Sequence, residues 1–304
     1  MIDAARVLER APEGGTVTDA RSPGALLDPS ALLGPGALLG GRYRIGQFIA
    51  AGGMGEVYEA RDELLRETIA VKLLRQDLLR KAGAQERFAD EIRMARKVTH
   101  VNVCRVFEVG IDGERVFYTM ELHGGETLAA RLRAGGAMSL DAIRPIARQV
   151  LAGIGAAHAA DVVHADLKPS NVLLADKGRV VVTDFGLALP CCATLACRCE
   201  MPHLVGTPAY MAPEQVTGGM VLDGTDLFAF GVILFEMLTG TLPWRGTTAL
   251  ELAEARLVGE RPSVRALCPA IDPRWDEVIR HCLACERRER PKDAAAVARA
   301  LDLA

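Results

Sequence analysis

An acid, a lysine and an amide fall within six residues of one another at Asp166, Lys168 and Asn171. The carboxylate of Asp166 can accept the proton of an attacking hydroxyl. Lys168 can neutralise charge on a phosphoryl group in transfer. The amide oxygen of Asn171 is a suitable neutral ligand for Mg²⁺. An ordinary polar turn explains this combination poorly, so the segment indicates phosphoryl-transfer chemistry.

A second carboxylate follows thirteen residues after Asn171, in the tripeptide Asp184-Phe185-Gly186. It comes directly after a short apolar strand at 180–182. A carboxylate at the end of a strand and before a glycine suits a hard-cation ligand. The tripeptide is common by itself, but its spacing from Asn171 indicates that Asp184 and Asn171 share one Mg²⁺ site.

A glycine-rich turn over residues 50–57 lies between two strand-like stretches and contains Gly52 and Gly55. Glycines allow a hairpin backbone to lie close to phosphate groups. This signal is weak alone, because ordinary hairpins also carry glycines. The glycine-rich turn becomes informative only together with the motifs that follow it in the sequence.

Lys72 lies on an apolar strand fifteen residues after the glycine-rich turn. The flanking Ala70 and Val71 favour a side chain that faces a site, although a lysine at a sheet edge can also reach solvent. Glu91, on the next predicted helix, is placed to pair with this amine. Such an ion pair would hold the lysine toward the α- and β-phosphates of a nucleotide.

The segment 206–214, Gly-Thr-Pro-Ala-Tyr-Met-Ala-Pro-Glu, ends on an acid with a candidate partner far along the chain. Arg290 is that partner, and a buried Glu214–Arg290 pair would tie the segment to the C-terminal helices. Breaking a buried pair typically costs about 3–5 kcal/mol. The alternative is a surface ion pair of little effect.

The elements needed to position these residues divide the chain into two lobes. Strand-like stretches are expected at 43–49, 56–60, 68–74, 104–111 and 115–121, with one helix at 85–98 among them. Helical periodicity then dominates at 140–160, 225–239, 249–258, 275–282 and 292–301. The pattern predicts an α+β fold, with a small strand-rich N-lobe over about 41–122 and a larger helical C-lobe over about 123–304. Residues 1–40, rich in Gly, Pro, Ala and Leu, are expected to form a flexible leader.

The ordered set of motifs resembles the eukaryotic-type protein kinase family in its bacterial serine/threonine branch. The resemblance covers about residue 43 to the C-terminus and implies a two-lobe kinase fold that uses ATP and Mg²⁺. It implies a catalytic set of Asp166, Lys168, Lys72 and Glu91, with Asn171 and Asp184 as metal ligands. It also implies a nucleotide pocket formed by Ile49, Gly52, Gly55, Val57, Ala70, Lys72, Met120, Glu121, His123 and Leu173. In that pocket the backbone of Glu121 and His123 would hold the adenine edge. Asp226 resembles the aspartate that anchors the catalytic loop.

The sequence departs from the family pattern at two single positions. Ala50 stands where the glycine-rich loop usually begins with glycine, which predicts altered ATP affinity. Ala165 stands where the family usually has an arginine that receives the phosphate of a phosphorylated activation loop. Without that receptor, we expect activity that does not require phosphorylation of Thr194, the one hydroxyl residue between Asp184 and Gly206.

Four thiols lie within nine residues, at Cys191, Cys192, Cys197 and Cys199. A zinc site or a redox pair is one interpretation. A loop that happens to carry thiols is the favoured one, because the spacing is not that of a common zinc knuckle.

Composition limits the classes of partner. The net charge of −3 favours neither nucleic acid nor an anionic membrane, and no apolar run is long enough to span a bilayer. The N-terminus lacks the apolar core of a signal peptide, so a cytoplasmic protein is expected. The partners would be proteins that carry Ser or Thr; the oligomeric state stays open. Two alternatives to an active kinase remain: a pseudokinase that acts as an ATP-binding scaffold, and a small-molecule phosphotransferase, against which the 206–214 segment argues.

Overall fold

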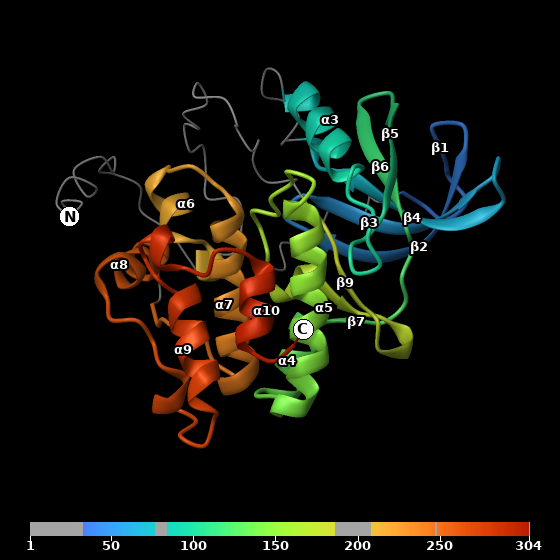
Figure 1. Ribbon diagram of the computed structural model, residues 1–304. Coiled ribbons are helices and arrows are strands. Elements are labelled where there is room, and N and C mark those ends of the chain that lie inside the picture. The colour runs from blue at the N-terminus through green and yellow to red at the C-terminus, as the bar shows by residue number, and fades with distance from the viewer. Residues whose placement is uncertain (1–32, 77–83, 186–207, 247, 304) are drawn as a thin grey trace.

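The computed structural model describes residues 33–76, 84–185, 208–246 and 248–303. Figure 1 shows a strand-rich lobe built from residues up to 120 and a helical lobe built from most of the residues that follow. The α+β, two-lobe prediction is confirmed. The first lobe ends at Met120, and three short strands at 126–127, 172–174 and 180–182 lie next to the helices of the second lobe.

Within the described residues, the N-lobe is a six-stranded antiparallel sheet in the order β1-β2-β3-β4-β6-β5. The strands are β1 (Leu38–Leu39), β2 (Tyr43–Gly52), β3 (Gly55–Asp62), β4 (Glu67–Leu74), β5 (Val106–Asp112) and β6 (Arg115–Met120). Helix α3 (Ala84–Ala95) packs near β5 at the end of the sheet where β5 and β6 pair. The strand β4, which carries Lys72, is inside the sheet and is almost entirely buried.

The structured N-lobe begins earlier than the sequence indicated. Residues 33–40 were expected to belong to a flexible leader. Instead, β1 pairs with β2, and the backbone N–H of Leu33 donates to the Tyr58 hydroxyl at 3.2 Å. Leu33 and Leu39 are buried in the same apolar cluster as Tyr58. Burial of these leucines against the sheet is the physical reason why the boundary at residue 40 was too late.

The C-lobe is built around α7 (Asp223–Thr239), which is buried along most of its length. Its other helices are α4 (Leu128–Gly135), α5 (Leu140–His158), α6 (Pro213–Thr217), α8 (Ala249–Val258), α9 (Pro273–Cys282) and α10 (Ala294–Ala300). Helix α5 contacts α7 and α10, and α7 contacts α9. None of the helices in the described ranges is long and apolar enough to cross a membrane.

A small sheet between the lobes positions the polar residues. It consists of β7 (Glu126–Thr127), β8 (Val172–Leu174) and β9 (Val180–Val182), all antiparallel. Asn171 directly precedes β8, and Asp184 comes two residues after β9. Since β8 and β9 are paired antiparallel, these two residues lie at the same end of the hairpin, where Thr183 N donates to Asn171 O at 2.9 Å.

Candidate active site

Residues 164–171, called the catalytic loop below after the role predicted for them, bring Asp166, Lys168 and Asn171 together as expected. Lys168 Nζ donates to Asp166 Oδ2 at 2.6 Å. Asn171 Nδ2 donates to the backbone carbonyl of Asp166 at 2.9 Å, which leaves the amide oxygen on the opposite side of that amide group. A short 3₁₀ turn, Pro169–Asn171, holds the spacing. The loop therefore presents a carboxylate, an ammonium and an amide in one hydrogen-bonded unit.

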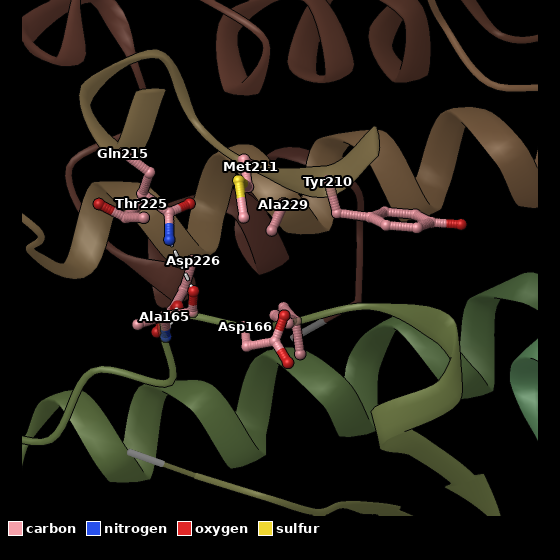
Figure 2. A pocket seen from close by; sticks show the side chains of 9 residues that line it. Ala165, Asp166, Tyr210, Met211, Gln215, Thr225, Asp226 and Ala229 are labelled. Carbon is pink, nitrogen blue, oxygen red and sulfur yellow. Dashed lines mark hydrogen bonds between the residues drawn. The ribbon is translucent and has the colours of Figure 1, made fainter. Parts of the chain in front are cut away.

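The backbone of this loop is held from the C-lobe by Asp226 on α7. Asp226 Oδ2 accepts from His164 N at 2.8 Å, and Oδ1 accepts from Ala165 N at 2.9 Å. On the other side, Gln215 Nε2 donates to Ala165 O at 2.7 Å. Figure 2 shows the side chains of Gln215 and Asp226 directed toward Ala165, while the Tyr210 ring extends away. The anchoring role that the resemblance implied for Asp226 is confirmed.

Ala165 itself adopts a left-handed backbone conformation, with φ of 63°, and is buried. A residue with a Cβ rarely occupies this region, and holding it there costs free energy. The two hydrogen bonds from Asp226 and Gln215 to its backbone stabilise that conformation. The loop is thus ordered by backbone contacts at the position where the sequence lacks an arginine.

A buried histidine supports the same aspartate. His158, the last residue of α5, has its Nε2 2.8 Å from Asp226 Oδ2. Burial disfavours a charged ring, but the hydrogen bond and the negative charge of Asp226 outweigh it, and the pKa of His158 is raised above its ordinary value. A protonated His158 therefore stabilises the carboxylate that holds the loop.

Asp184 is the point at which the two lobes meet through charge. Lys72 Nζ donates to Asp184 Oδ1 at 2.6 Å, and the Tyr118 hydroxyl donates to the same oxygen at 2.9 Å. Burial disfavours the ionised carboxylate, but these contacts outweigh it and lower the pKa of Asp184. Next to it, the buried Phe185 ring lies 4.6 Å from the His164 ring. Asp184 is thus held ionised between the N-lobe sheet and the catalytic loop.

The predicted Lys72–Glu91 pair stays a prediction. Glu91 lies on α3, as expected, but its side chain lies outside the described part of the structure. The described partner of Lys72 is Asp184, and the lysine side chain is 7% exposed. Lys72 has three donors, and the contact with Asp184 uses one of them.

Four of the apolar residues predicted to enclose adenine lie together. Ala70 and Met120 are cross-strand partners on β4 and β6. Val57 and Leu173 are partly buried, and they pack against the apolar cluster that contains Ala70 and Met120. By contrast, Ile49 on β2 is 48% exposed, in keeping with a position at the edge of a pocket.

The segment after Met120 connects the lobes and contains Glu121 and His123. Glu121 N donates to Arg105 O at 2.9 Å, so the backbone group that Glu121 has left for a ligand is its carbonyl. That carbonyl accepts only a weak contact from the Cys104 thiol at 3.6 Å. The His123 ring is largely buried, with Nε2 3.4 Å from Glu121 Oε2 in a geometry that makes no hydrogen bond. Their proposed contacts with adenine remain predictions.

The glycine-rich hairpin shows two different reasons for glycine. A Cβ on Gly55 would lie 2.0 Å from the backbone oxygen of Leu73, so β4 requires glycine there. A Cβ on Gly52 or Gly53 would meet nothing within 4 Å, which leaves the tip of the hairpin open for a ligand. Ala50 is part of β2 opposite Val57, so its methyl group is compatible with the hairpin.

The predicted Glu214–Arg290 pair is confirmed and is bidentate. Arg290 Nη1 and Nη2 donate to Glu214 Oε1 and Oε2 at 2.8 and 2.7 Å. The arginine side chain is fully buried and also donates to three backbone carbonyls. Thr225 adds a hydrogen bond to Glu214 at 2.7 Å. The pair joins α6 to the start of α7 and to the chain after α9.

The structure adds polar residues that the sequence did not single out. Tyr118 contacts Asp184, Gln215 contacts the catalytic loop, and His158 contacts Asp226, which anchors that loop. In addition, Tyr210 donates to Glu236 at 2.6 Å beneath the segment that precedes α6. Tyr210 lies in the 206–214 segment, whereas Tyr118, Gln215 and His158 belong to none of the motifs described above. An aromatic residue on a strand normally indicates core packing.

The predicted cysteine cluster and the phosphosite lie outside the described residues. This applies to Cys191, Cys192, Cys197, Cys199 and Thr194. Among the residues that the structure does describe, no group of three or more His, Cys, Asp or Glu side chains could hold a metal ion. The thiols in these ranges at Cys104, Cys268, Cys282 and Cys285 are free.

The donor chemistry at the end of the β8–β9 hairpin fits Mg²⁺. Asp184 contributes a carboxylate and Asn171 an amide oxygen, which are hard oxygen ligands. Two such ligands from the protein are consistent with Mg²⁺, which usually keeps several waters and binds substrate phosphates as well. Asp184 Oδ2 has no hydrogen bond from the described residues, since both donors reach Oδ1.

Comparison with known proteins gives one consistent family. The model of the protein kinase domain matches residues 43–300. Probable serine/threonine-protein kinase pknA2 of Bifidobacterium longum is 36% identical over 86% of this chain and 35% of its own length. Serine/threonine-protein kinase PknL of Mycobacterium tuberculosis is 36% identical over 86% of this chain and 65% of its own. Serine/threonine-protein kinase PrkC of Bacillus subtilis is 33% identical over 79% of this chain and 37% of its own length.

Solved structures agree on the fold. The PknI kinase domain of Mycobacterium tuberculosis superposes with a TM-score of 0.72 at 22% identity, over 89% of this chain and 98% of that one. The chain spans between about a third and two thirds of the length of the curated relatives named above. With the kinase model matching residues 43–300 and bacterial serine/threonine kinases as its relatives, the chain belongs to the protein kinase family.

Proposed function

We propose that this chain transfers the γ-phosphoryl group of ATP, with Mg²⁺, to serine and threonine hydroxyls of protein substrates, its own chain included. The observation that carries the proposal is the unit of Asp166 and Lys168, joined at 2.6 Å on a loop that Asp226 clamps. A carboxylate and an ammonium held in one rigid unit are what this transfer requires, because its catalysis is mostly positioning and charge neutralisation.

Asp166 and Lys168 have separate roles in this proposal. The Asp166 carboxylate orients the attacking hydroxyl and accepts its proton. The Lys168 ammonium, which is partly exposed, stabilises the negative charge of the phosphoryl group during transfer. The hydrogen bond of Asn171 Nδ2 to the Asp166 carbonyl fixes the loop. The amide oxygen accepts one long hydrogen bond from Ser170 Oγ at 3.5 Å and has a second lone pair for a metal.

Lys72, Asp184 and Asn171 would form the phosphate end of the nucleotide site. Lys72 lies on the rigid, buried strand β4 and would hold the α- and β-phosphates. Asp184 and Asn171 would bind Mg²⁺, which when present neutralises charge on the phosphates. Glu91, on α3, is proposed to pair with Lys72 through one of the two donors that the contact with Asp184 leaves.

The adenine end of the site would lie between the lobes. Val57 and Ala70 come from the N-lobe sheet and Leu173 from the small sheet, so together they offer apolar surface on both faces of a flat ring. Ile49 and Met120 would complete the wall, with the backbone of Glu121 and His123 at the adenine edge. The open tip at Gly52 leaves space above the phosphates.

The product of the reaction tests this proposal. The chain is incubated with ATP, Mg²⁺, a reductant and a generic basic protein, and phosphorylated residues are identified by mass spectrometry. We expect phosphoserine and phosphothreonine on the substrate and on the chain itself, and none with Asp184→Asn. ATP that binds without any phosphorylated product would instead favour the pseudokinase.

A further inference from the structure

Tyr118 makes a contact with Asp184 that the catalytic set above does not include. Its hydroxyl donates to Asp184 Oδ1 at 2.9 Å. The side chain is 1% exposed, and Asp184 is the one hydrogen-bond partner of that hydroxyl among the described residues. A buried hydroxyl without a partner costs free energy, so the contact with Asp184 is strongly preferred.

The backbone register explains why this tyrosine reaches Asp184. Lys72 and Tyr118 are direct cross-strand partners on β4 and β6. Directly paired residues project their side chains to the same face of a sheet. Both donors therefore approach Asp184 from one side and share its Oδ1.

The Tyr118 ring is itself held in place. It packs in the same buried cluster as Phe88 and Ile92 of α3, and its ring centroid lies 6.0 Å from that of Phe88. Together with Asp184 and Phe185 it also lines a small cavity between α3 and the end of β9. A rigid ring with its hydroxyl on a carboxylate fixes the rotation of that carboxylate.

We propose that Tyr118 is a positioning residue that orients the Asp184 carboxylate for a divalent cation. Among the described residues, both donors to this carboxylate reach Oδ1, so Oδ2 is the oxygen that we assign to the metal. This inference rests on the proposed function, because it assigns Asp184 the role of metal ligand. Groups that orient metal-binding carboxylates typically contribute 10–100-fold to metal affinity or activity.

The test measures metal binding apart from turnover. The whole chain is saturated with a non-hydrolysable ATP analogue, and Mn²⁺ binding is followed by the electron paramagnetic resonance of the free ion. We expect Tyr118→Phe to raise the Mn²⁺ dissociation constant about 10-fold or more. Affinity for the analogue in the presence of a chelator should not change. In turnover, the KM for Mg²⁺ should rise while the KM for ATP does not.

Tyr58→Phe is the matched control. Tyr58 lies on β3 of the same sheet, is equally buried, and its hydroxyl bonds to Glu56 rather than to Asp184. We expect this variant to bind Mn²⁺ as the wild type does.

Unchanged Mn²⁺ binding in Tyr118→Phe would overturn the positioning role and leave the proposed function standing. Equal weakening in both variants would overturn it too, since the effect would then be general loosening of the sheet. A wild type that binds no Mn²⁺ beside the nucleotide would refute the proposed function, and the positioning role with it.

Discussion

At the scale of single residues, the catalytic loop is ordered by side chains that bind backbone groups. Asp226 accepts from the N–H groups of His164 and Ala165, and Gln215 donates to the carbonyl of Ala165. Each bond involves a buried group, for which the loss of one partner is costly. The position of Asp166 therefore depends on Asp226 and Gln215, which bind the backbone of the residues just before it.

The raised pKa of His158 makes part of this ordering dependent on pH. Because the pKa is higher in the folded chain, the stabilisation is fully present below the unfolded value of about 6.5 and is lost as pH rises through the folded value. We expect His158→Gln to lower the free energy of unfolding more at about pH 6 than at about pH 9. Urea unfolding of both proteins at the two pH values measures this.

The exposed His281, on α9, provides the control for that experiment. His281→Gln should lower the free energy of unfolding by a similar small amount at both pH values. If the penalty for His158→Gln were independent of pH, the protonated His158–Asp226 pair would not contribute to stability.

At the scale of elements, the motifs predicted which strands and helices carry the site, but not the contacts between them. Strand β4 and helix α7 were expected from the sequence pattern, Lys72 from its motif, and Asp226 from the family resemblance. Tyr118 was not, because a strand tyrosine that reaches a carboxylate looks in sequence like one that fills a core. Its role depends on the register of β4 and β6, which pairs it with Lys72.

The start of the N-lobe also could not be predicted from the sequence. Residues 33–40 have the glycine and proline content of a linker, yet Leu33 and Leu39 fill an apolar cluster of the N-lobe. Composition reports an average over a segment, whereas burial depends on two side chains. The need for glycine at position 55 likewise depends on a contact that the sequence does not show, because a Cβ there would collide with the Leu73 carbonyl of the neighbouring strand.

Helix α8 contains a buried charged side chain, that of Arg256. Arg256 is 4% exposed, and its Nε and Nη2 have no hydrogen-bond partner in the part of the chain that the structure describes. Its guanidinium lies 5.7 Å from the Trp244 ring, and burial lowers the pKa of Arg256 to about 10. The contact with the ring offsets only part of the cost of burying a charge.

We therefore expect Arg256→Met to stabilise the protein. Replacing buried ionic groups with apolar side chains of similar volume often stabilises by about 1–4 kcal/mol. Thermal and urea unfolding would measure the change, with Arg245→Met, at an exposed arginine beside Trp244, as the control that should have little effect. A less stable Arg256→Met would mean that the contact of the guanidinium with the Trp244 ring outweighs the cost of burying the charge.

At the scale of the whole molecule, two charged contacts connect distant parts of the chain. Lys72–Asp184 joins the N-lobe sheet to the end of β9, and Glu214–Arg290 joins α6 to the chain after α9. Between them lies the catalytic loop, anchored to α7. The described contacts that hold the catalytic loop and connect these parts of the chain do not involve a phosphate group.

The contacts around the catalytic loop support the prediction that activity does not require phosphorylation of Thr194. Position 165 offers no cation to receive a phosphate, and Asp226 and Gln215 already hold its backbone. We expect Thr194→Ala to keep most of the rate of phosphoryl transfer, measured after phosphatase treatment of both proteins. A loss of most of that rate would show that a phosphate at Thr194 orders the site.

The initial rate of phosphoryl transfer from γ-labelled ATP to a basic protein, with Mg²⁺ and reductant, tests the central claim most directly. Wild type is compared with Asp166→Asn and with Asp176→Asn, an exposed aspartate on the same stretch of chain. Removal of a general base typically costs about 10²–10⁴-fold. The account predicts a loss of that size for Asp166→Asn and a wild-type rate for Asp176→Asn. Equal rates in all three proteins, or no transfer by the wild type, would contradict it.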